Sequence, residues 1–313
     1  MTIGIALPAG VEATTNAVDE YVTLAEEAAT AGLSSVWFSQ RFDADALSLA
    51  AVVGARVPGI AIGTSVVPIY PRHPIVVASQ ANVAQAASHS RFTLGLGLGA
   101  AALTEPTFGV DASRSIVHLR EYLTVLGSLF GTGTVDFTGE TLVAATPRPA
   151  SLAGATRPDI VVAAMGPQAL RVTGELADGT LPYLAGPRTL AEFIVPQITE
   201  AAERAGRPAP RIAVALAAVV TDDAAGVHTR LAEQSAFYKR VPSYAAVLER
   251  EGLTDPAELA VIGDEAALAD AVAVYRAAGA TELILTNTAS GGDESRRRTW
   301  AAAAQLAWEG AHR

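Results

Sequence analysis

The sequence predicts an α/β protein of the (β/α)8-barrel class, and two observations support that prediction. Short runs of Ile, Val, Leu and Phe alternate along the chain with longer segments whose apolar residues recur at helical spacing. Eight such strand-and-helix units in 313 residues fit a barrel of about 250 residues with insertions better than an open doubly wound sheet. We therefore expect one domain over residues 1–313.

Each expected strand is followed by a segment with helical periodicity. The strands are expected at residues 3–8, 35–39, 60–68, 92–99, 159–165, 180–185, 211–221 and 282–287. The helices are expected at residues 17–32, 43–56, 74–89, 113–130, 167–177, 189–205 and 294–310. Residues 131–142, GTGTVDFTGETL, predict a short hairpin, and the segment between the seventh and eighth strands holds more helix than one unit requires.

The composition excludes several classes of function. The chain has 22 Lys and Arg against 32 Asp and Glu, and its net charge of −10 disfavours nucleic acid and anionic membranes as partners. Without cysteine it forms no disulfide, Cys-ligated zinc site or thiol nucleophile. The first residues, MTIGIALPAG, lack the basic start and apolar segment of a signal peptide, and no later apolar run approaches the ~18–20 residues that a spanning helix needs, so neither is expected. We expect a cytoplasmic protein with a small-molecule substrate.

Glycines occur at the carboxyl ends of several expected strands, where a barrel of this class carries its active site. GLGLG at residues 95–99 is a weak match to a dinucleotide loop, because the third spaced Gly is missing and no helix is expected directly after it. Its glycines either relieve crowding in a curved strand or let the backbone approach a flat ligand.

Two Gly–Pro turns, at Gly166 and Gly186, lie at adjacent strand ends. In each, the proline takes the first helical position and leaves free backbone N–H groups that can bind phosphate. Each turn alone is equally compatible with an ordinary strand-to-helix connection. Together, with Arg188 in the second, they favour an anion site.

Acids and bases are scarce at these strand ends. Four histidines lie in expected helices and are expected to be structural or solvated: His89, His118, His228 and His312. In YPRHP, Arg72 could meet an anionic ligand, and His73 fits either a site or a packing role at a helix entry. No HExxH, acidic cluster or GxSxG is present, so no metal is expected and no catalytic residue is assigned. These features favour an organic cofactor.

Four segments together resemble a known family. They are TSVVPIYPRHPIVVASQ, RFTLGLGLG, MGPQALRVTGELADGTLPYLAGPRT and VIGDEAALADAV. The chain resembles the bacterial luciferase-like monooxygenase superfamily, and specifically its branch of coenzyme F420-dependent oxidoreductases, common in actinobacteria. The resemblance implies a (β/α)8 barrel with a deazaflavin or FMN across the barrel mouth. We further expect a homodimer.

The resemblance implies cofactor contacts at the second and third strand ends. It places Ser39 and Gln40 at the ring, and Thr64, Ser65 and Val66 behind it. The family's non-proline cis peptide, in a bulge of the third strand, would here join Ser65 to Val66. Its convex backbone would press against the ring as a backstop.

The resemblance also implies contacts to the rest of the cofactor. The residues are Gly97, Gly99 and Ala100 along the cofactor's side chain, and Ala164, Met165 and Gly166 at its phosphate. The phosphate position agrees with the free N–H groups expected at that helix start. Arg72 and Arg188 are the candidates for offsetting the chain's net negative charge.

Two positions depart from the family's alcohol-oxidising dehydrogenases, which carry His where Gln40 stands and Glu where Ala100 stands. Because Gln cannot accept a proton near neutral pH, a sugar-phosphate dehydrogenase is disfavoured. We expect an F420-dependent oxidoreductase that transfers a hydride between the deazaflavin and a small organic substrate. The alternatives are an FMN-dependent monooxygenase on the same barrel and a non-catalytic flavin-binding or carrier protein.

Overall fold

All eight expected strands are present in the computed structural model, which describes residues 1–8 and 16–311. The chain packs as two units, one formed by Met1–Trp37, Leu181–Gln197 and Arg211–Arg313, the other by Phe38–Thr180 and Ile198–Pro210. We call them unit 1 and unit 2. One domain over the whole chain stays a prediction, and His312 lies outside the described residues.

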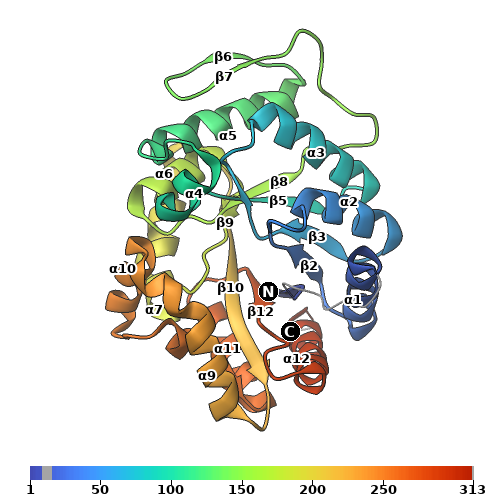
Figure 1. The fold of residues 1–313 in the computed structure, drawn as a ribbon, viewed down its shortest axis with the longest axis vertical. Helices are drawn as coiled ribbons and strands as arrows, with labels where there is room; N and C mark the ends of the chain where they lie inside the picture. The colour runs from blue at the N-terminus through green and yellow to red at the C-terminus, as the bar shows by residue number, and fades with distance from the viewer. Residues whose placement is uncertain (9–15, 312–313) are drawn as a thin grey trace. The chain divides into compact units, whose positions relative to one another are not determined.

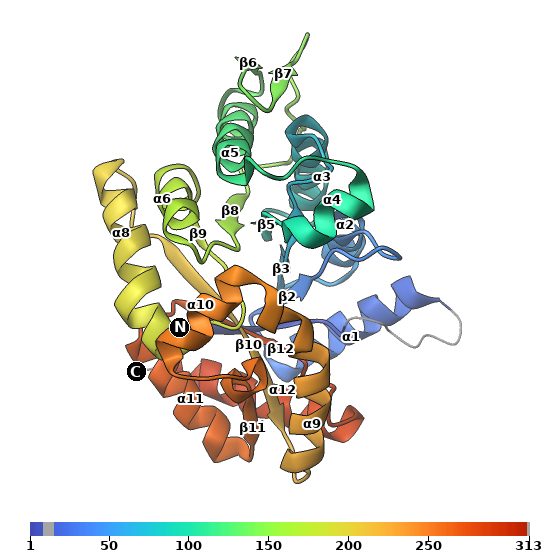
Figure 2. The ribbon, with the colours of Figure 1, turned by 60° about the vertical axis from the view of Figure 1, so that its left-hand side comes forward.

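Unit 1 contains parallel strands in the order β11–β10–β12–β1–β2. These are β1 (Thr2–Ala6), β2 (Ser35–Phe38), β10 (Arg211–Val220), β11 (Val261–Gly263) and β12 (Glu282–Thr286). The helices are α1 (Ala17–Ala31), α7 (Pro187–Thr189), α9 (Ala224–Ser235), α10 (Pro242–Glu251), α11 (Glu265–Ala277) and α12 (Asp293–Ala311). Figure 2 shows α9, α11 and α12 grouped around β10 and β11. A π-helical segment, η1 (Leu190–Ile194), continues α7 and leads into α8 (Val195–Arg204).

Unit 2 contains parallel strands in the order β3–β5–β8–β9, with β4 also paired to β5. These are β3 (Ala61–Thr64), β4 (Val67–Pro68), β5 (Phe92–Gly97), β8 (Asp159–Val162) and β9 (Gly179–Thr180). The helices are α2 (Ala46–Arg56), α3 (Pro74–Ala87), α4 (Ala101–Phe108), α5 (Ser115–Thr132) and α6 (Pro167–Leu176). Helices α2, α3, α5 and α6 pack in succession beside one another (Figure 1). The expected hairpin is confirmed as β6 (Asp136–Thr138) antiparallel to β7 (Val143–Ala145).

Local chemistry explains where most helices begin and end. Asn16 caps α1 by accepting from the Val18 N–H, and Gly32 ends the helix in the left-handed conformation with φ 92°. Pro167 takes the first position of α6, as expected from the sequence. Among the described residues, no helix is both long and apolar enough to cross a membrane.

Two elements differ from the sequence-based expectation. Helix α4 begins directly after the glycine-rich strand, where no helix was expected. Pro106 lies inside α4 and disfavours a helix there, but left-handed Gly99 turns the chain and the Thr104 N–H then bonds to the Ala100 carbonyl. Strand β11 was expected to be part of a helical insertion. It has only three residues, too few to show an alternating pattern, and pairs with the end of β10.

Candidate functional site

A bulge interrupts the third expected strand in unit 2. Ile62 lies opposite Phe92 and Val67 lies opposite Leu96, so this strand advances five residues while β5 advances four. The extra residue falls between β3 and β4, and the Ser65–Val66 peptide bond there is cis, as the resemblance implied. The sequence expectation of a cis bond in a bulge is therefore confirmed.

Hydrogen bonds from neighbouring segments hold this bulge in place. The buried Thr64 hydroxyl donates to the Gly95 carbonyl and accepts from the Gly95 N–H, each at 2.9 Å. The Ser39 hydroxyl donates to the Ser65 carbonyl at 2.9 Å, and the Ser65 N–H donates to the Phe38 carbonyl at 2.8 Å. Residues Phe38 and Ser39 and strand β5 thus hold the backbone at Thr64 and Ser65, on the amino side of the cis bond.

Gly97 lacks a side chain at the place where the bulge packs onto β5. A Cβ atom on Gly97 would lie 2.5 Å from Cγ2 of Val66, closer than real Cβ contacts allow. This contact gives Gly97 a packing role that agrees with the crowding interpretation of the GLGLG glycines. Val66 and Gly97, two residues expected at the cofactor, are in contact.

The Gln40 side chain is fully occupied by the loop that precedes α2. Its amide oxygen accepts from the Ala46 N–H and from Nη2 of Arg72, each at 3.1 Å, and its amide nitrogen donates to the Arg41 carbonyl at 2.8 Å. Gln40 therefore holds the loop before α2 in one conformation. The sequence, which shows only that Gln stands at position 40, does not reveal this structural role.

Arg72 also forms an ion pair with Asp45, the residue that caps α2. Burial raises the pKa of Asp45, but hydrogen bonds from Ser48 and the Arg72 guanidinium outweigh it and hold that pKa below its usual value. Nη1 of Arg72 is buried and has no hydrogen-bond partner among the described residues. This donor can still bind an acceptor supplied by a ligand.

The Gly166 turn at the start of α6 is open. Gly166 caps the helix without a side-chain hydrogen bond, and the first intrahelical bond runs from the Leu170 N–H to the Gly166 carbonyl. The N–H groups of Gln168 and Ala169 precede that bond and have no intrahelical acceptor. A Cβ on Gly166 would meet nothing within 4 Å. The turn offers free donors and the positive end of a helix dipole.

The preceding segment is held by Thr180, whose buried hydroxyl bridges two carbonyls. Its oxygen lies 2.9 Å from the Val162 carbonyl and 3.0 Å from the Ala164 carbonyl, and the two carbonyls share its single O–H donor. The backbone at Val162 and Ala164, just before the Gly166 turn, is therefore held within unit 2.

The second Gly–Pro turn, at Gly186, is occupied by a carboxylate of the chain itself. The Thr189 N–H donates to Oε1 of Glu251, and a Cβ on Gly186 would lie 2.5 Å from Oε2 of that residue. Arg188 is exposed and pairs with Glu192 at 3.1 Å. The two turns share a sequence pattern, but only the Gly166 turn is open to an external anion. A cofactor role for Arg188 stays a prediction.

His73 has the packing role that the sequence left open. It caps α3, with Nδ1 accepting from the Ile75 N–H, and Nε2 lies 2.9 Å from the Val143 carbonyl. His118 stacks on Tyr70 with ring centroids 4.4 Å apart, and its Nδ1 lies 2.9 Å from the Thr141 hydroxyl. Burial lowers the pKa of His118, so the ring is neutral near neutral pH.

Sequence reasoning missed a second cis bond and a buried carboxylate near these histidines. The Tyr70–Pro71 bond is cis, for which the Tyr–Pro pair was the available signal. Glu121 accepts hydrogen bonds from the Glu140 and Thr141 N–H groups and from the Thr141 hydroxyl, and so anchors the hairpin turn to α5. No sequence motif linked Glu121 to a turn about twenty residues later.

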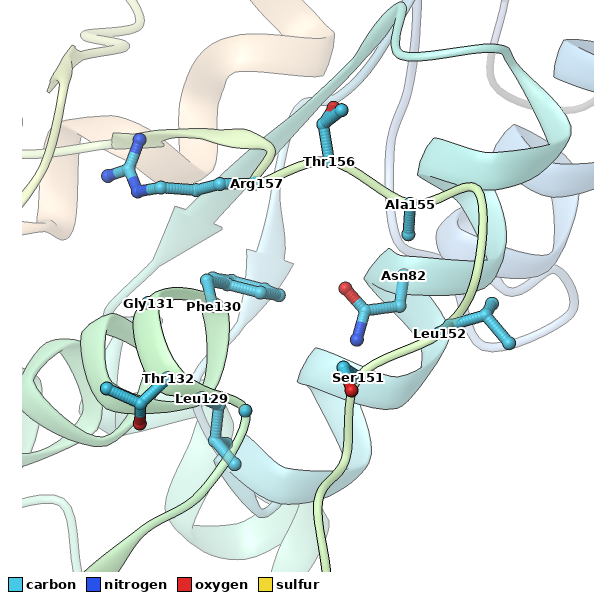
Figure 3. A pocket seen from close by; sticks show the side chains of 11 residues that line it. Asn82, Leu129, Phe130, Gly131, Thr132, Ser151, Leu152, Ala155, Thr156 and Arg157 are labelled. Carbon is cyan, nitrogen blue, oxygen red and sulfur yellow. The ribbon is translucent and has the colours of Figure 1, made fainter.

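A cavity of about 200 Å³ lies elsewhere in unit 2, between the end of α5 and residues 151–157. Figure 3 shows Asn82 on α3 facing Ser151, with Leu129 and Phe130 of α5 across the opening. Arg157, which also lines it, lies two residues before the start of β8, so the cavity lies at the amino end of that strand. Active sites of this fold class lie at the carboxyl ends. This cavity is therefore separate from the candidate cofactor site.

The described residues contain no group of three or more His, Asp or Glu side chains that could hold a metal ion. Unit 2 contains a bulged strand with a cis peptide, a glycine packed against it, a guanidinium nitrogen without a partner among the described residues and an open helix start. This arrangement provides backbone surface and hydrogen-bond donors rather than acids, bases or metal ligands. It suits a bound organic group with a flat face and a phosphate.

Comparison with solved structures establishes the fold class. The chain is a (β/α)8 barrel with insertions, of the type in the F420-dependent tetrahydromethanopterin reductase from Methanopyrus kandleri. The TM-score is 0.80 over 97% of both chains, at 20% identity. An oxygenating Baeyer–Villiger component of 3,6-diketocamphane monooxygenase from Pseudomonas putida, solved with FMN, matches 98% of both chains with a TM-score of 0.77 at 16% identity.

The sequence then identifies the family. The chain belongs to the luciferase-like monooxygenase family, whose model matches residues 1–282. A curated relative, 5,10-methylenetetrahydromethanopterin reductase from Methanolobus tindarius, is 29% identical over 255 residues, which are 81% of this chain and 76% of the relative. The resemblance inferred from the four sequence segments is therefore confirmed.

Proposed function

We propose that the protein is a coenzyme F420-dependent oxidoreductase that transfers a hydride between the deazaflavin and a small organic substrate. The observation that carries the proposal is the bulge with its cis Ser65–Val66 bond, held by Thr64 and Ser39 and packed on Gly97. The similar fold of a solved reductase that depends on coenzyme F420 supports it. Deazaflavin, when bound, supplies hydride donation and acceptance.

Particular residues of unit 2 would hold this cofactor. The backbone of Ser65 and Val66 would provide a surface for the ring, and Nη1 of Arg72 a donor for a ring or tail oxygen. Gly99 and Ala100 would line the cofactor's side chain. The N–H groups at the start of α6 would bind the phosphate, where the helix dipole contributes about 0.3–1 kcal/mol.

Proton transfer is not assigned to Gln40 or Ala100. Gln40 uses both ends of its amide to hold the loop before α2, and Ala100 carries no titratable group. A substrate whose reaction needs a protein carboxylate or imidazole at those positions is therefore disfavoured. Sugar-phosphate oxidation is disfavoured on the same ground.

An anaerobic spectrophotometric assay tests the proposal. The protein is mixed with reduced F420 and a panel of ketone, enone and quinone acceptors, and the absorbance band of oxidised deazaflavin is followed. We expect this band to return with at least one acceptor. In a parallel aerobic assay, a protein that acts only with reduced FMN and oxygen is instead a monooxygenase, the alternative favoured by the similar structure with FMN. No turnover with either cofactor favours the carrier alternative.

A further inference from the structure

A second cavity, of about 150 Å³, lies in unit 1 at the carboxyl ends of β10 and β12. Helix α9 and two short 3₁₀ segments, η2 (Ala236–Arg240) and η3 (Pro256–Leu259), surround it. Ala217 of β10, Leu231 of α9 and Ala257 of η3 line the cavity and also pack together in the local core. Figure 2 shows α9 and α10 in this part of the chain. Its lining mixes apolar and uncharged polar side chains, and a cavity of this size accommodates one benzene-sized ring.

Charge is absent from the side chains that line this cavity. Its lining includes Tyr183 and Tyr238. The two rings meet edge to face with centroids 5.5 Å apart, and both contact Tyr244. Burial raises the pKa of all three phenols, so they stay neutral over the physiological range. A charged ligand would lose its hydration here without gaining a counter-ion.

Two hydrogen-bond donors are available at the cavity. The Asn287 amide donates to Oε1 of Gln234 at 3.2 Å, which leaves the Gln234 amide nitrogen without an acceptor among the described residues. The Tyr238 hydroxyl also forms no hydrogen bond within the described part of the chain. Gln234 is exposed, so the cavity has a polar entrance that a ligand can reach from solvent.

Two lining residues adopt left-handed backbone conformations without being glycine. Leu184 has φ 51° and Asn287 has φ 58°. Asn tolerates this conformation, whereas for a buried Leu it is unfavourable and is retained only where the surrounding structure enforces it. Such residues cluster at ligand-binding positions, and both here follow segments that pair with β10.

We infer that this cavity binds one uncharged ring of roughly six to eight non-hydrogen atoms that carries a hydrogen-bond acceptor, such as a carbonyl oxygen. The apolar walls would contact the ring, and the Gln234 amide and Tyr238 hydroxyl would donate to the acceptor. That the bound molecule is the substrate rests on the proposed function. The binding itself does not, because it requires only unit 1 residues.

Binding to the cofactor-free protein tests the inference. Cyclohexanone and the charged, similarly sized cyclohexanecarboxylate are titrated in parallel and followed by saturation-transfer NMR. We expect saturable binding of cyclohexanone and, at equal concentrations, none of the carboxylate. Absence of cyclohexanone binding, or equal binding of the carboxylate, overturns the inference.

Variants then locate the bound ring. Gln234→Leu removes a donor and is expected to weaken cyclohexanone binding about two- to ten-fold, whereas Glu233→Leu, at its exposed neighbour outside the cavity, is expected to leave it unchanged. Ala260→Phe should fill the cavity and abolish binding, with exposed Ala225→Phe on α9 as the control. Unchanged binding in both Gln234→Leu and Ala260→Phe contradicts the assignment.

Cofactor titration of the same variants separates the two proposals. We expect Ala260→Phe to bind F420 with wild-type affinity while losing cyclohexanone. If the wild-type protein binds cyclohexanone at this cavity but neither F420 nor FMN, the proposed function fails and the ring site stands.

Discussion

The two Gly–Pro turns have nearly the same sequence and present different surfaces. At Gly166 the first N–H groups of α6 have no intrahelical acceptor and no side-chain cap among the described residues, and the space beside Gly166 is open. At Gly186 the Glu251 carboxylate accepts from the Thr189 N–H. A helix start attracts anions only when the chain does not supply one itself. The difference favours α6 over the second turn as the place for the proposed cofactor phosphate, and it gives the second turn a structural role.

Placing a carboxylate on the open turn should have the largest effect. Gly166→Glu is expected to weaken F420 binding at least about ten-fold, or about 1.4 kcal/mol, because it brings negative charge to the expected phosphate position. Gly166→Gln has the same size without the charge and should lose less affinity. Calorimetric titration measures both, with circular dichroism to confirm folding. Unchanged affinity in folded Gly166→Glu would put the phosphate on another helix.

Adding a Cβ to the occupied turn should affect stability and not the cofactor. Gly186→Ala is expected to displace the Glu251 carboxylate and cost about 0.5–2 kcal/mol of unfolding free energy, comparable with the loss of a helix cap. Gly166→Ala, whose Cβ meets nothing within 4 Å, is the matched control and should cost little.

A double-mutant cycle sharpens this prediction. In a Glu251→Ala background, Gly186→Ala should cost almost nothing further, because the carboxylate it displaces is already gone. Denaturant unfolding of the four proteins gives the coupling free energy. Additive effects would show that Gly186 is required for another reason.

Salt dependence should distinguish the two arginines that are candidates for offsetting the net charge of −10. Cofactor affinity is expected to fall as ionic strength rises, and Arg72→Ala to flatten that dependence while charge-retaining Arg72→Lys preserves it. Arg188→Ala should flatten it less, because Arg188 is exposed, pairs with Glu192 and adjoins the occupied turn. An equal or larger effect of Arg188→Ala would reverse our assignment of the two turns.

At the start of α2 the capping carboxylate comes from the adjacent residue, Asp45. We expect its protonation to have the smallest effect on stability of the changes considered. Because the folded pKa of Asp45 lies below the ordinary 3.8, its contribution is present above that value and is lost as the pH falls through the folded pKa. Wild type should lose about 0.5–1 kcal/mol on acidification below pH ~4, an amount typical of a helix cap. Asp45→Asn should lose less over the same window. Parallel losses in thermal unfolding would contradict this.

The sequence predicted the helices and strands better than it predicted the contacts between residues that are distant in the chain. Hydrophobic periodicity located all eight strands, and Asn16, Gly32 and Pro167 explain helix ends from local chemistry. Helix α4 was missed because Pro106 outweighed the left-handed turn at Gly99, a conformation that sequence alone does not reveal.

Within the candidate site, a backbone feature was predicted correctly and a set of side-chain contacts was not. The cis bond between Ser65 and Val66 followed from the family resemblance, whereas the use of Gln40 by the loop before α2 did not. Glu251 was unpredictable at the Gly186 turn, because the contact joins residues about sixty positions apart and no local pattern encodes it.

The central claim is that the open Gly166 turn and the bulge at Ser65 and Val66 bind a deazaflavin in preference to FMN. Calorimetric titration of the cofactor-free protein with F420 and with FMN, under identical buffer and salt, tests this most directly. We predict a lower dissociation constant for F420, and a loss of that binding in Gly166→Glu. Equal affinity for the two cofactors, or tighter binding of FMN, would contradict the account.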